Sequence, residues 1–221
     1  MLNWISLSLP IKKTMAVYKN LEEKRPRIET TRNFLQHGMH ESILHLPLHT
    51  GTHVDYPLHA MDGGKCSSDY QRFPIEFNAL IVDLCPQQPS TIALDLVRTL
   101  PMETIDAVFF RTLEQPLEEF DPLFPGVTDE AAAWLCEYPL LFVGIDQPGI
   151  ERAQPGHPSH IRLLGKDILI IEGLDLSRVA GGGHFQCRAF TLGIEGVEAE
   201  PVLVFARAIP SSRGRRKGAT L

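Results

Sequence analysis

The sequence predicts one domain of mixed α/β or α+β architecture, and three observations lead to that expectation. The chain has 221 residues, of which 43% are hydrophobic and 22% are charged, as is ordinary for a soluble globular protein. Short apolar segments of strand length recur along the chain, with only a few helical patterns between them. No internal repeat or low-complexity linker divides the sequence, so a single domain over residues 1–221 is expected.

The N-terminal part is predicted to consist of two strands around a polar segment. Residues 4–9 alternate in character and predict a strand that Pro10 ends. Residues 18–37 are polar and form either a loop or a short helix, because Pro26 would interrupt one continuous helix. The alternating leucines of residues 44–48 predict a half-buried strand.

The rest of the chain is predicted to alternate between apolar strands and two capped helices. A short helix over residues 90–100 would begin at Ser90 or Thr91. A second helix begins after Thr128, because a capping hydroxyl and two acidic residues precede strong helix formers. The strands are expected at residues 79–84, 107–110, 140–145, 167–172, 185–192 and 202–208.

The charge balance argues against a nucleic-acid partner, and the shortness of the apolar runs argues against a membrane-spanning protein. Asp and Glu number 27 against 21 Lys and Arg, which leaves a net charge of −6, whereas nucleic-acid binders usually carry a basic stripe. The dense basic run lies at residues 213–217, and we expect residues 211–221 to form a solvated, flexible tail. No apolar run approaches the roughly 18 residues that a membrane-spanning helix needs.

The cysteines and the N-terminus predict a cytoplasmic protein. The four cysteines contain no C-x-x-C pair and are too sparse for a secreted disulfide scaffold. The first residues lack the basic start and the small-residue cleavage site of a signal peptide. A reducing compartment is therefore expected.

A histidine-rich segment at residues 49–59 carries the strongest functional signal. On a straight strand His49 and His53 would lie roughly 13 Å apart, so the chain must bend between them, and Gly51 permits a bend. A helix would turn Asp55 away from His53. The alternative is a hydrogen-bonded polar turn, but burying so many titratable groups without a metal is costly. The candidate ligands occupy alternate positions: His49, His53, Asp55 and His59.

The same segment carries a family resemblance. Its pattern His-x-Gly-Thr-His-x-Asp-x-Pro-x-His resembles the signature of the metal-dependent cyclase/hydrolase family, which includes bacterial kynurenine formamidase and isatin hydrolase. Residues 124–146 resemble the central helix and following strand of that family. Residues 160–164 and 170–174 resemble its second metal-binding stretch.

The resemblance implies a set of site residues and a metal cofactor. His49, His53 and Asp55 would bind one metal ion, and Asp55 would also face a second ion. His160 and Glu172 would complete this second site, with Glu172 able to touch both ions. His59 would be the catalytic proton donor and acceptor. The implied cofactor is one or two divalent ions per chain, either zinc or manganese.

The resemblance also implies a fold and an assembly. The expected fold is a swivelling β/β/α domain, in which flanking helices surround a central, mixed, barrel-like sheet. The expected assembly is a homodimer or homotetramer in which N-terminal segments lie across the partner.

The implied reaction is hydrolysis of an amide-type bond in a small molecule by metal-activated water. The candidate substrates are an aryl formamide such as N-formyl-kynurenine and related lactams or lactones. Tyr18 stands where formamidases have a substrate-contacting Trp and could stack on an aryl ring, but simple strand packing would explain it equally well. Two alternatives remain: a cyclase acting on another small carbonyl substrate, and a non-catalytic metal-binding member of the family.

Overall fold

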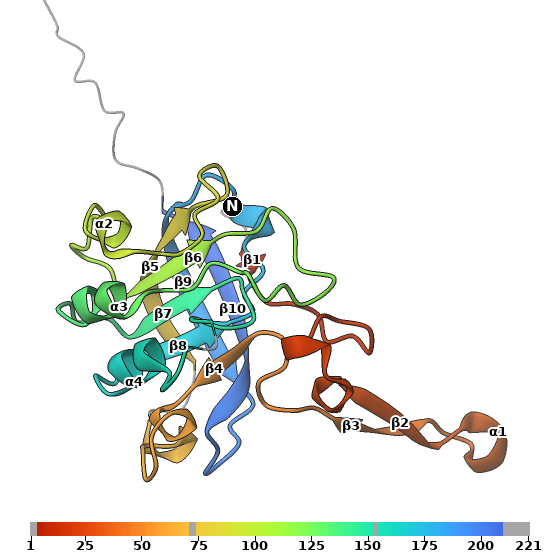
Figure 1. Ribbon diagram of the computed structural model, residues 1–221. Coiled ribbons are helices and arrows are strands. Elements are labelled where there is room, and N and C mark those ends of the chain that lie inside the picture. The colour runs from red at the N-terminus through yellow and green to blue at the C-terminus, as the bar shows by residue number, and fades with distance from the viewer. Residues whose placement is uncertain (1–3, 71–73, 153, 210–221) are drawn as a thin grey trace, which may run out of the picture.

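A computed structural model describes residues 4–70, 74–152 and 154–209, so the predicted tail at 211–221 lies outside the described residues. Within these ranges the dominant feature is a sheet with strand order β1-β10-β4-β8-β7-β6-β5-β9 (Figure 1). Strands β9 and β10 also pair with each other, which closes all of these strands except β1 into a barrel. The strands are β1 (Ile5–Ser6), β4 (His53–Asp55), β5 (Ile75–Asp83), β6 (Ala107–Arg111), β7 (Phe142–Ile145), β8 (Leu169–Glu172), β9 (Gly183–Thr191) and β10 (Ala199–Ala208).

The barrel is mixed because it contains both parallel and antiparallel strand pairs. Neighbours β5, β6, β7 and β8 run parallel, whereas β4, β9, β10 and β1 pair antiparallel. Parallel neighbours need crossover connections. Three short helices lie in these crossovers, side by side along the outside of the parallel strands: α2 (Leu94–Val97), α3 (Asp129–Leu135) and α4 (Pro158–Leu164) (Figure 1). The expected barrel-like mixed sheet with flanking helices is confirmed.

The core fills the barrel and the space beneath the helices. Every residue of β6 is buried, as expected for a parallel strand that is covered on both faces. Inside the barrel the Phe77 ring lies 4.9 Å from that of Phe142 and 6.0 Å from that of Phe109, measured between centroids. At the start of α3 the Thr128 hydroxyl accepts the Ala131 N–H, which confirms the cap predicted there.

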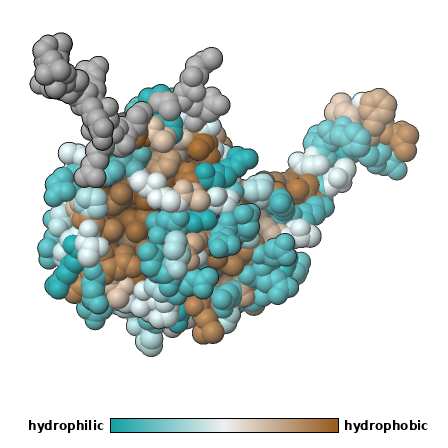
Figure 2. Space-filling view, turned by 90° about the horizontal axis from the view of Figure 1, so that it is seen from above, coloured by the Kyte–Doolittle hydropathy of each residue, from teal (hydrophilic) through white to brown (hydrophobic). Residues whose placement is uncertain are grey.

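An arm projects from the barrel and has no counterpart in its layers (Figure 1). It consists of β2 (Arg27–Arg32), the single turn α1 (Phe34–His37) and β3 (Glu41–His45), and every residue of these three elements is exposed. Asn33 caps α1 by accepting the Gln36 N–H, and Gly38 ends it with a φ of 70°. Figure 2 shows hydrophobic side chains at the far end of the arm.

The arm overturns two local expectations. Leu44 is half exposed and belongs to an exposed hairpin, not to a half-buried strand at 44–48. The alternation is real, but β3 has no core beside it on this chain. Residues 27–32 form a strand inside the segment expected to be a loop or short helix.

Other elements differ from their predicted limits by a few residues. The helix expected at 90–100 is the short α2, whose N-cap is Ala93 and whose cap makes no side-chain hydrogen bond. Isolated 3₁₀ turns occupy Tyr18–Asn20, Glu22–Lys24, Pro57–His59, Ser67–Asp69 and Ser177–Val179.

Among the described residues, no helix has both the length and the apolar character needed to cross a bilayer.

Candidate metal centre

Strand pairing brings the two predicted ligand stretches together. In the antiparallel pair β4–β8, His53 lies directly opposite Glu172, and Asp55 lies opposite Ile170. Directly opposed residues in such a pair have side chains in contact range. Two stretches separated by more than a hundred residues therefore meet through backbone register and not through a flexible loop.

Two glycines allow the turn before β4 to fold against the end of β8. Gly51 has a φ of 74°, which confirms the bend predicted between His49 and His53. Gly173 has a φ of 63°, and a β-carbon there would collide with the Gly51 carbonyl. The hydroxyl of Thr52 donates to the Gly173 carbonyl at 2.5 Å. Any larger residue at position 173 would push the two ligand stretches apart.

Two carboxylates lie at the centre of the cluster, and each faces two histidines. The oxygens of Asp55 lie 3.5 Å from Nε2 of His53 and 3.9 Å from Nε2 of His160. The oxygens of Glu172 lie 3.5 Å from Nε2 of His53 and 3.3 Å from Nε2 of His160. Each carboxylate points one oxygen toward His53 and the other toward His160. This is an arrangement that can bridge two cations.

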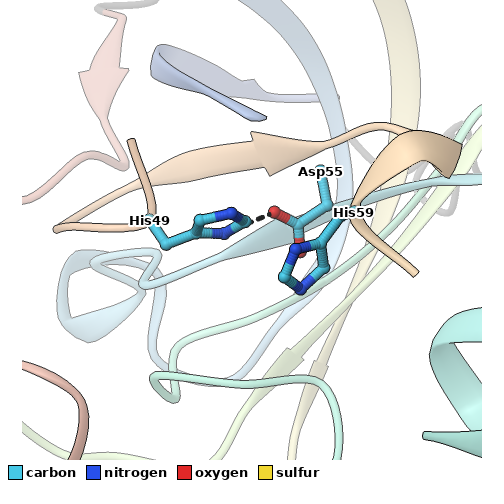
Figure 3. Close-up of side chains that lie close together, drawn as sticks. All are labelled: His49, Asp55 and His59. Atoms are coloured by element: carbon cyan, nitrogen blue, oxygen red, sulfur yellow. Dashed lines mark ion pairs between the residues drawn. The ribbon is translucent and has the colours of Figure 1, made fainter. Parts of the chain in front are cut away.

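His49 and His59 also lie beside Asp55 (Figure 3). Nδ1 of His49 is 3.0 Å from Oδ1 of Asp55, and its Nε2 is 3.5 Å from a carboxylate oxygen of Glu198. The His59 ring, at the end of the 3₁₀ turn Pro57–His59, lies 4.2 Å from the His49 ring between centroids. The structure therefore brings together all six residues predicted to hold metal or transfer protons.

Buried polar atoms of the cluster lack hydrogen-bond partners within the described part of the chain. Both oxygens of Asp55 and Nε2 of His53 are buried without one. The Asp55 side chain has 0% exposure, and within residues 4–70, 74–152 and 154–209 its ion-pair partners are all histidines. Buried carboxylates need a strong compensating partner. Oxygen and imidazole donors that converge in this way fit a divalent cation such as zinc or manganese.

The electrostatics of the cluster also fit a bound divalent cation. Although burial disfavours a charged ring, Asp55 and Glu172 together raise the pKa of His53 to about 9. Burial also opposes charge on His160, yet the carboxylates around it raise its pKa to about 10. Burial alone would raise the pKa of Glu172, but the two histidines outweigh it and lower the pKa. Without metal, the carboxylates hold protons on the rings, and a bound cation would displace those protons.

The pKa of His59 moves the opposite way. Its side chain reaches the surface, but partial burial and the neighbouring His49 and His160 lower the pKa, and Asp55 offsets this only in part. A lowered pKa keeps the ring neutral near pH 7, so it can accept a proton.

A cavity of about 700 Å³ opens beside the cluster. His49 and His53 reach its lining, and Tyr18 forms part of its outer wall. The Tyr18 ring packs edge-on against Phe120 with centroids 5.1 Å apart. His59 is not part of this lining but stands beside it, behind His49. The predicted substrate-contacting position therefore faces the cavity, and the predicted proton carrier lies next to it.

Sequence reasoning missed two polar residues at the centre. Glu151 contacts His160, and Glu198 contacts His49. Neither residue belongs to the histidine-rich pattern. The sequence shows only a glutamate in a loop in each case, and the fold brings each side chain to the cluster.

A comparison with known proteins decides the family. The family model called Cyclase matches residues 5–152 of this chain. The chain belongs to this cyclase family. The family expected from the histidine signature is thus confirmed.

Individual cyclase-family proteins resemble the chain to different extents. Cyclase-like protein 3 of Oryza sativa subsp. japonica is 31% identical over 173 residues, which are 73% of this chain and 63% of the rice protein. The kynurenine formamidase of Salinibacter ruber is 27% identical over 209 residues, which cover 93% of this chain and 98% of that enzyme. The chain thus spans under two thirds of the rice protein but nearly all of the formamidase.

A solved structure extends the likeness to the fold. A potential metal-dependent hydrolase with cyclase activity superposes with a TM-score of 0.81 at 32% identity, covering 95% of this chain and 100% of that chain. The fold of this chain is therefore shared with a protein described as a potential metal-dependent hydrolase.

Proposed function

We propose that the chain is a metal-dependent hydrolase that uses metal-activated water to cleave an amide-type C–N bond in a small molecule. The observation that carries the proposal is the buried pair of carboxylates, Asp55 and Glu172, whose oxygens face His53 on one side and His160 on the other. A cavity of about 700 Å³ beside this pair has room for a single-ring or double-ring substrate.

The chain's own residues divide the work in the proposed reaction. His49, His53 and Asp55 would hold one cation, and Asp55, His160 and Glu172 a second one. A divalent cation, when bound, supplies acidification of water and polarisation of a carbonyl oxygen. The His59 ring lies 4.2 Å from the ring of the proposed ligand His49, measured between centroids. From this position His59 would take a proton from the attacking water and return it to the leaving nitrogen. Tyr18 would contact the substrate ring from the cavity wall.

We propose an aryl formamide such as N-formyl-kynurenine, or a related lactam or lactone, as substrate. The formamidase of Salinibacter ruber supports this choice through its likeness along nearly the full chain. Zinc and manganese are both compatible with the imidazole and carboxylate donors, and the paired oxygens favour two ions over one. The free thiols of Cys66, Cys85, Cys136 and Cys187 fit the reducing cytoplasm that we propose as the location.

The test combines elemental analysis of the purified protein with a hydrolysis screen followed by mass spectrometry. We expect close to two transition-metal ions per chain and a product heavier than the substrate by one water. A cyclised product without the added mass of one water would instead identify the protein as a cyclase. Full metal loading with no turnover of any formamide, lactam or lactone would instead indicate a metal-binding protein without catalysis.

We further propose that the chain works as a homodimer or homotetramer held by the arm. A two-stranded hairpin is barely stable alone in water, yet this one exposes Phe34 (66%) and Leu35 (98%) at its tip. A second copy of the chain that buries this tip would supply the missing packing.

The arm can be tested by measuring mass in solution. Light scattering of the wild type should give a dimer or tetramer, and Leu35→Asp should shift the population toward monomer. Leu123→Asp is the matched control, because Leu123 is also a largely exposed leucine (73%) but belongs to the body of the molecule. A monomeric wild type, or equal dissociation by both variants, would refute the arm as the contact.

A further inference from the structure

We propose that Glu151 is a positioning residue for the metal centre, which fixes the orientation and the tautomer of His160. Its side chain has 0% exposure and lies beneath the first turn of α4. Oε1 of Glu151 is 2.7 Å from Nδ1 of His160. Oε2 accepts the Ser159 N–H at 2.9 Å. The inference rests on the metal site of the proposed function and adds to it a residue outside the signature.

A carboxylate at this position determines which ring nitrogen of His160 is protonated. An ionised carboxylate can only accept hydrogen bonds, so Nδ1 of His160 must carry its hydrogen toward Glu151. In the neutral ring the lone pair then lies on Nε2, the nitrogen that faces Glu172 and Asp55. Metal-binding histidines usually donate their second nitrogen to such an acceptor.

His53 is arranged in the same way, which supports this reading. Its Nδ1 lies 3.0 Å from the carbonyl oxygen of Gly51, an acceptor that cannot change its role. Its Nε2 therefore faces Asp55 and Glu172, as Nε2 of His160 does. The two histidines on opposite sides of the carboxylate pair present the same nitrogen to it. In His53 the backbone holds the ring, and in His160 the Glu151 side chain does.

Glu151 also holds the helix that carries His160. The N-cap residue of α4 is His157, which has a φ of 45° and makes no side-chain cap hydrogen bond. Glu151 accepts the Ser159 N–H in its place, and also lies 3.4 Å from the N–H of His160. One buried carboxylate therefore fixes the start of the helix and the ring that projects from it.

A rival reading assigns the same atoms to a separate metal site. Ligand atoms of Glu151, His157 and His160 lie within 4.8 Å of one another. Such a site would use Nδ1 of His160 as a metal ligand, which excludes its hydrogen bond to Glu151. His157 is 60% exposed, and its Nδ1 is 3.6 Å from Glu151, a longer separation than the 2.7 Å of the His160 contact. The geometry favours the hydrogen bond.

The decisive variant is Glu151→Gln, which keeps the shape but replaces one acceptor by a donor. The two hydrogen bonds use different oxygens of Glu151, and glutamine has an oxygen at only one of these positions, so His160 loses its fixed tautomer or α4 loses its cap. We expect the affinity for one of the two metal ions to fall about 10- to 100-fold, measured by chelator competition with zinc. The affinity of the His53 side should change little. Excess zinc should restore turnover.

A spectroscopic readout separates positioning from general weakening of the fold. In the zinc-loaded wild type, proton–nitrogen NMR should show His160 Nδ1 protonated and slow to exchange with solvent. Glu151→Gln should lose this signal. Glu151→Asp, which keeps a carboxylate, should recover part of the affinity and serves as the second variant if the glutamine form does not fold.

Controls distinguish the possible failures. His157→Asn should bind zinc as the wild type does, and loss of one ion in that variant would establish the rival site. Wild-type affinity and an intact Nδ1 signal in Glu151→Gln would overturn the positioning role. A wild type that bound no zinc would overturn the proposed metal site together with the positioning role that rests on it, whereas normal zinc binding by both the wild type and Glu151→Gln would overturn the positioning role alone.

Discussion

The metal cluster beside the cavity and the outer wall of the cavity are built in opposite ways. The cluster residues on the barrel strands, here called the floor, are His53, Asp55 and Glu172; they come from paired strands and are buried, and His53 reaches the cavity lining. The wall comes from irregular segments at residues 9–18 and 115–119, where charged residues stay exposed. Backbone ladders hold the floor, whereas isolated contacts hold the wall, such as the Tyr18–Phe120 ring pair and the hydrogen bond from Arg25 to the Met15 carbonyl.

This difference separates chemistry from selectivity. Groups on the barrel strands cannot shift without breaking the sheet, so they suit a reaction that needs fixed geometry. Loop residues can change without disturbing the core, so they suit recognition that varies between relatives. Substitutions in the floor should therefore abolish metal binding or rate, and substitutions in the wall should change substrate affinity by small factors.

The largest effect is expected at Asp55. Replacing it by Asn removes the charge that faces three histidines, and the amide nitrogen would point a donor at one of them. We expect Asp55→Asn to lose stoichiometric metal and all detectable hydrolysis, as shown by elemental analysis and product formation. A fully active Asp55→Asn enzyme would contradict the assigned ligands.

The next largest effect is expected at His59, which touches the cluster without being a proposed ligand. His59→Gln should keep at least one metal ion but lose roughly two to four powers of ten in kcat, the usual value of a proton carrier. Metal content measured on the same sample separates this outcome from ligand loss. Loss of metal in His59→Gln would place His59 among the ligands.

A smaller effect is expected at Tyr18 in the wall. Removing an aromatic contact worth about 0.5–1.5 kcal/mol should raise KM by roughly 2- to 12-fold, with kcat nearly unchanged. Tyr18→Ala is compared with Tyr18→Phe, which keeps the ring and should behave as the wild type. An unchanged KM in Tyr18→Ala would show that the ring only packs against Phe120.

The smallest effect is expected from the exposed carboxylates of the wall. Glu118 and Glu119 line the cavity, and exposed charges contribute only about 0.2–1 kcal/mol. Glu118→Gln should lower KM for a negatively charged aryl formamide by roughly two-fold and leave a neutral one unchanged. High salt should remove the difference, because it screens exposed charges. A change in kcat would instead indicate a contact with the reacting groups.

Much of the floor could be predicted from sequence because the information is local. The spacing of His49, His53 and Asp55 demanded a bend, and Gly51 supplied it with a φ of 74°. Short, continuous apolar runs located much of the barrel, including β6 and β8. The residues alone do not show which strands pair. The proximity of His53 and Glu172 was therefore expected only from the family resemblance, and the register of β4 and β8 then showed it.

Two features escaped sequence reasoning because they depend on three-dimensional packing that no periodic pattern encodes. Glu151 lies in a loop with no repeating pattern, and its importance arises only when α4 folds over it. The alternation around Leu44 predicts burial, but the partner surface is absent from this chain's own core. Periodicity shows that a face is apolar without showing what covers it.

The position of β4 in the sheet has a consequence for biosynthesis. This strand lies between β8 and β10, and β10 is formed by residues 199–208, late in the chain. While the ribosome is still making the earlier strands, His53 and Asp55 sit on a strand whose second neighbour does not yet exist. Pairing of Pro201 with His53 and of Ala199 with Asp55 can follow only after those residues emerge. The nascent protein therefore completes the sheet around its metal-binding strand only after residues 199–201 have been synthesised.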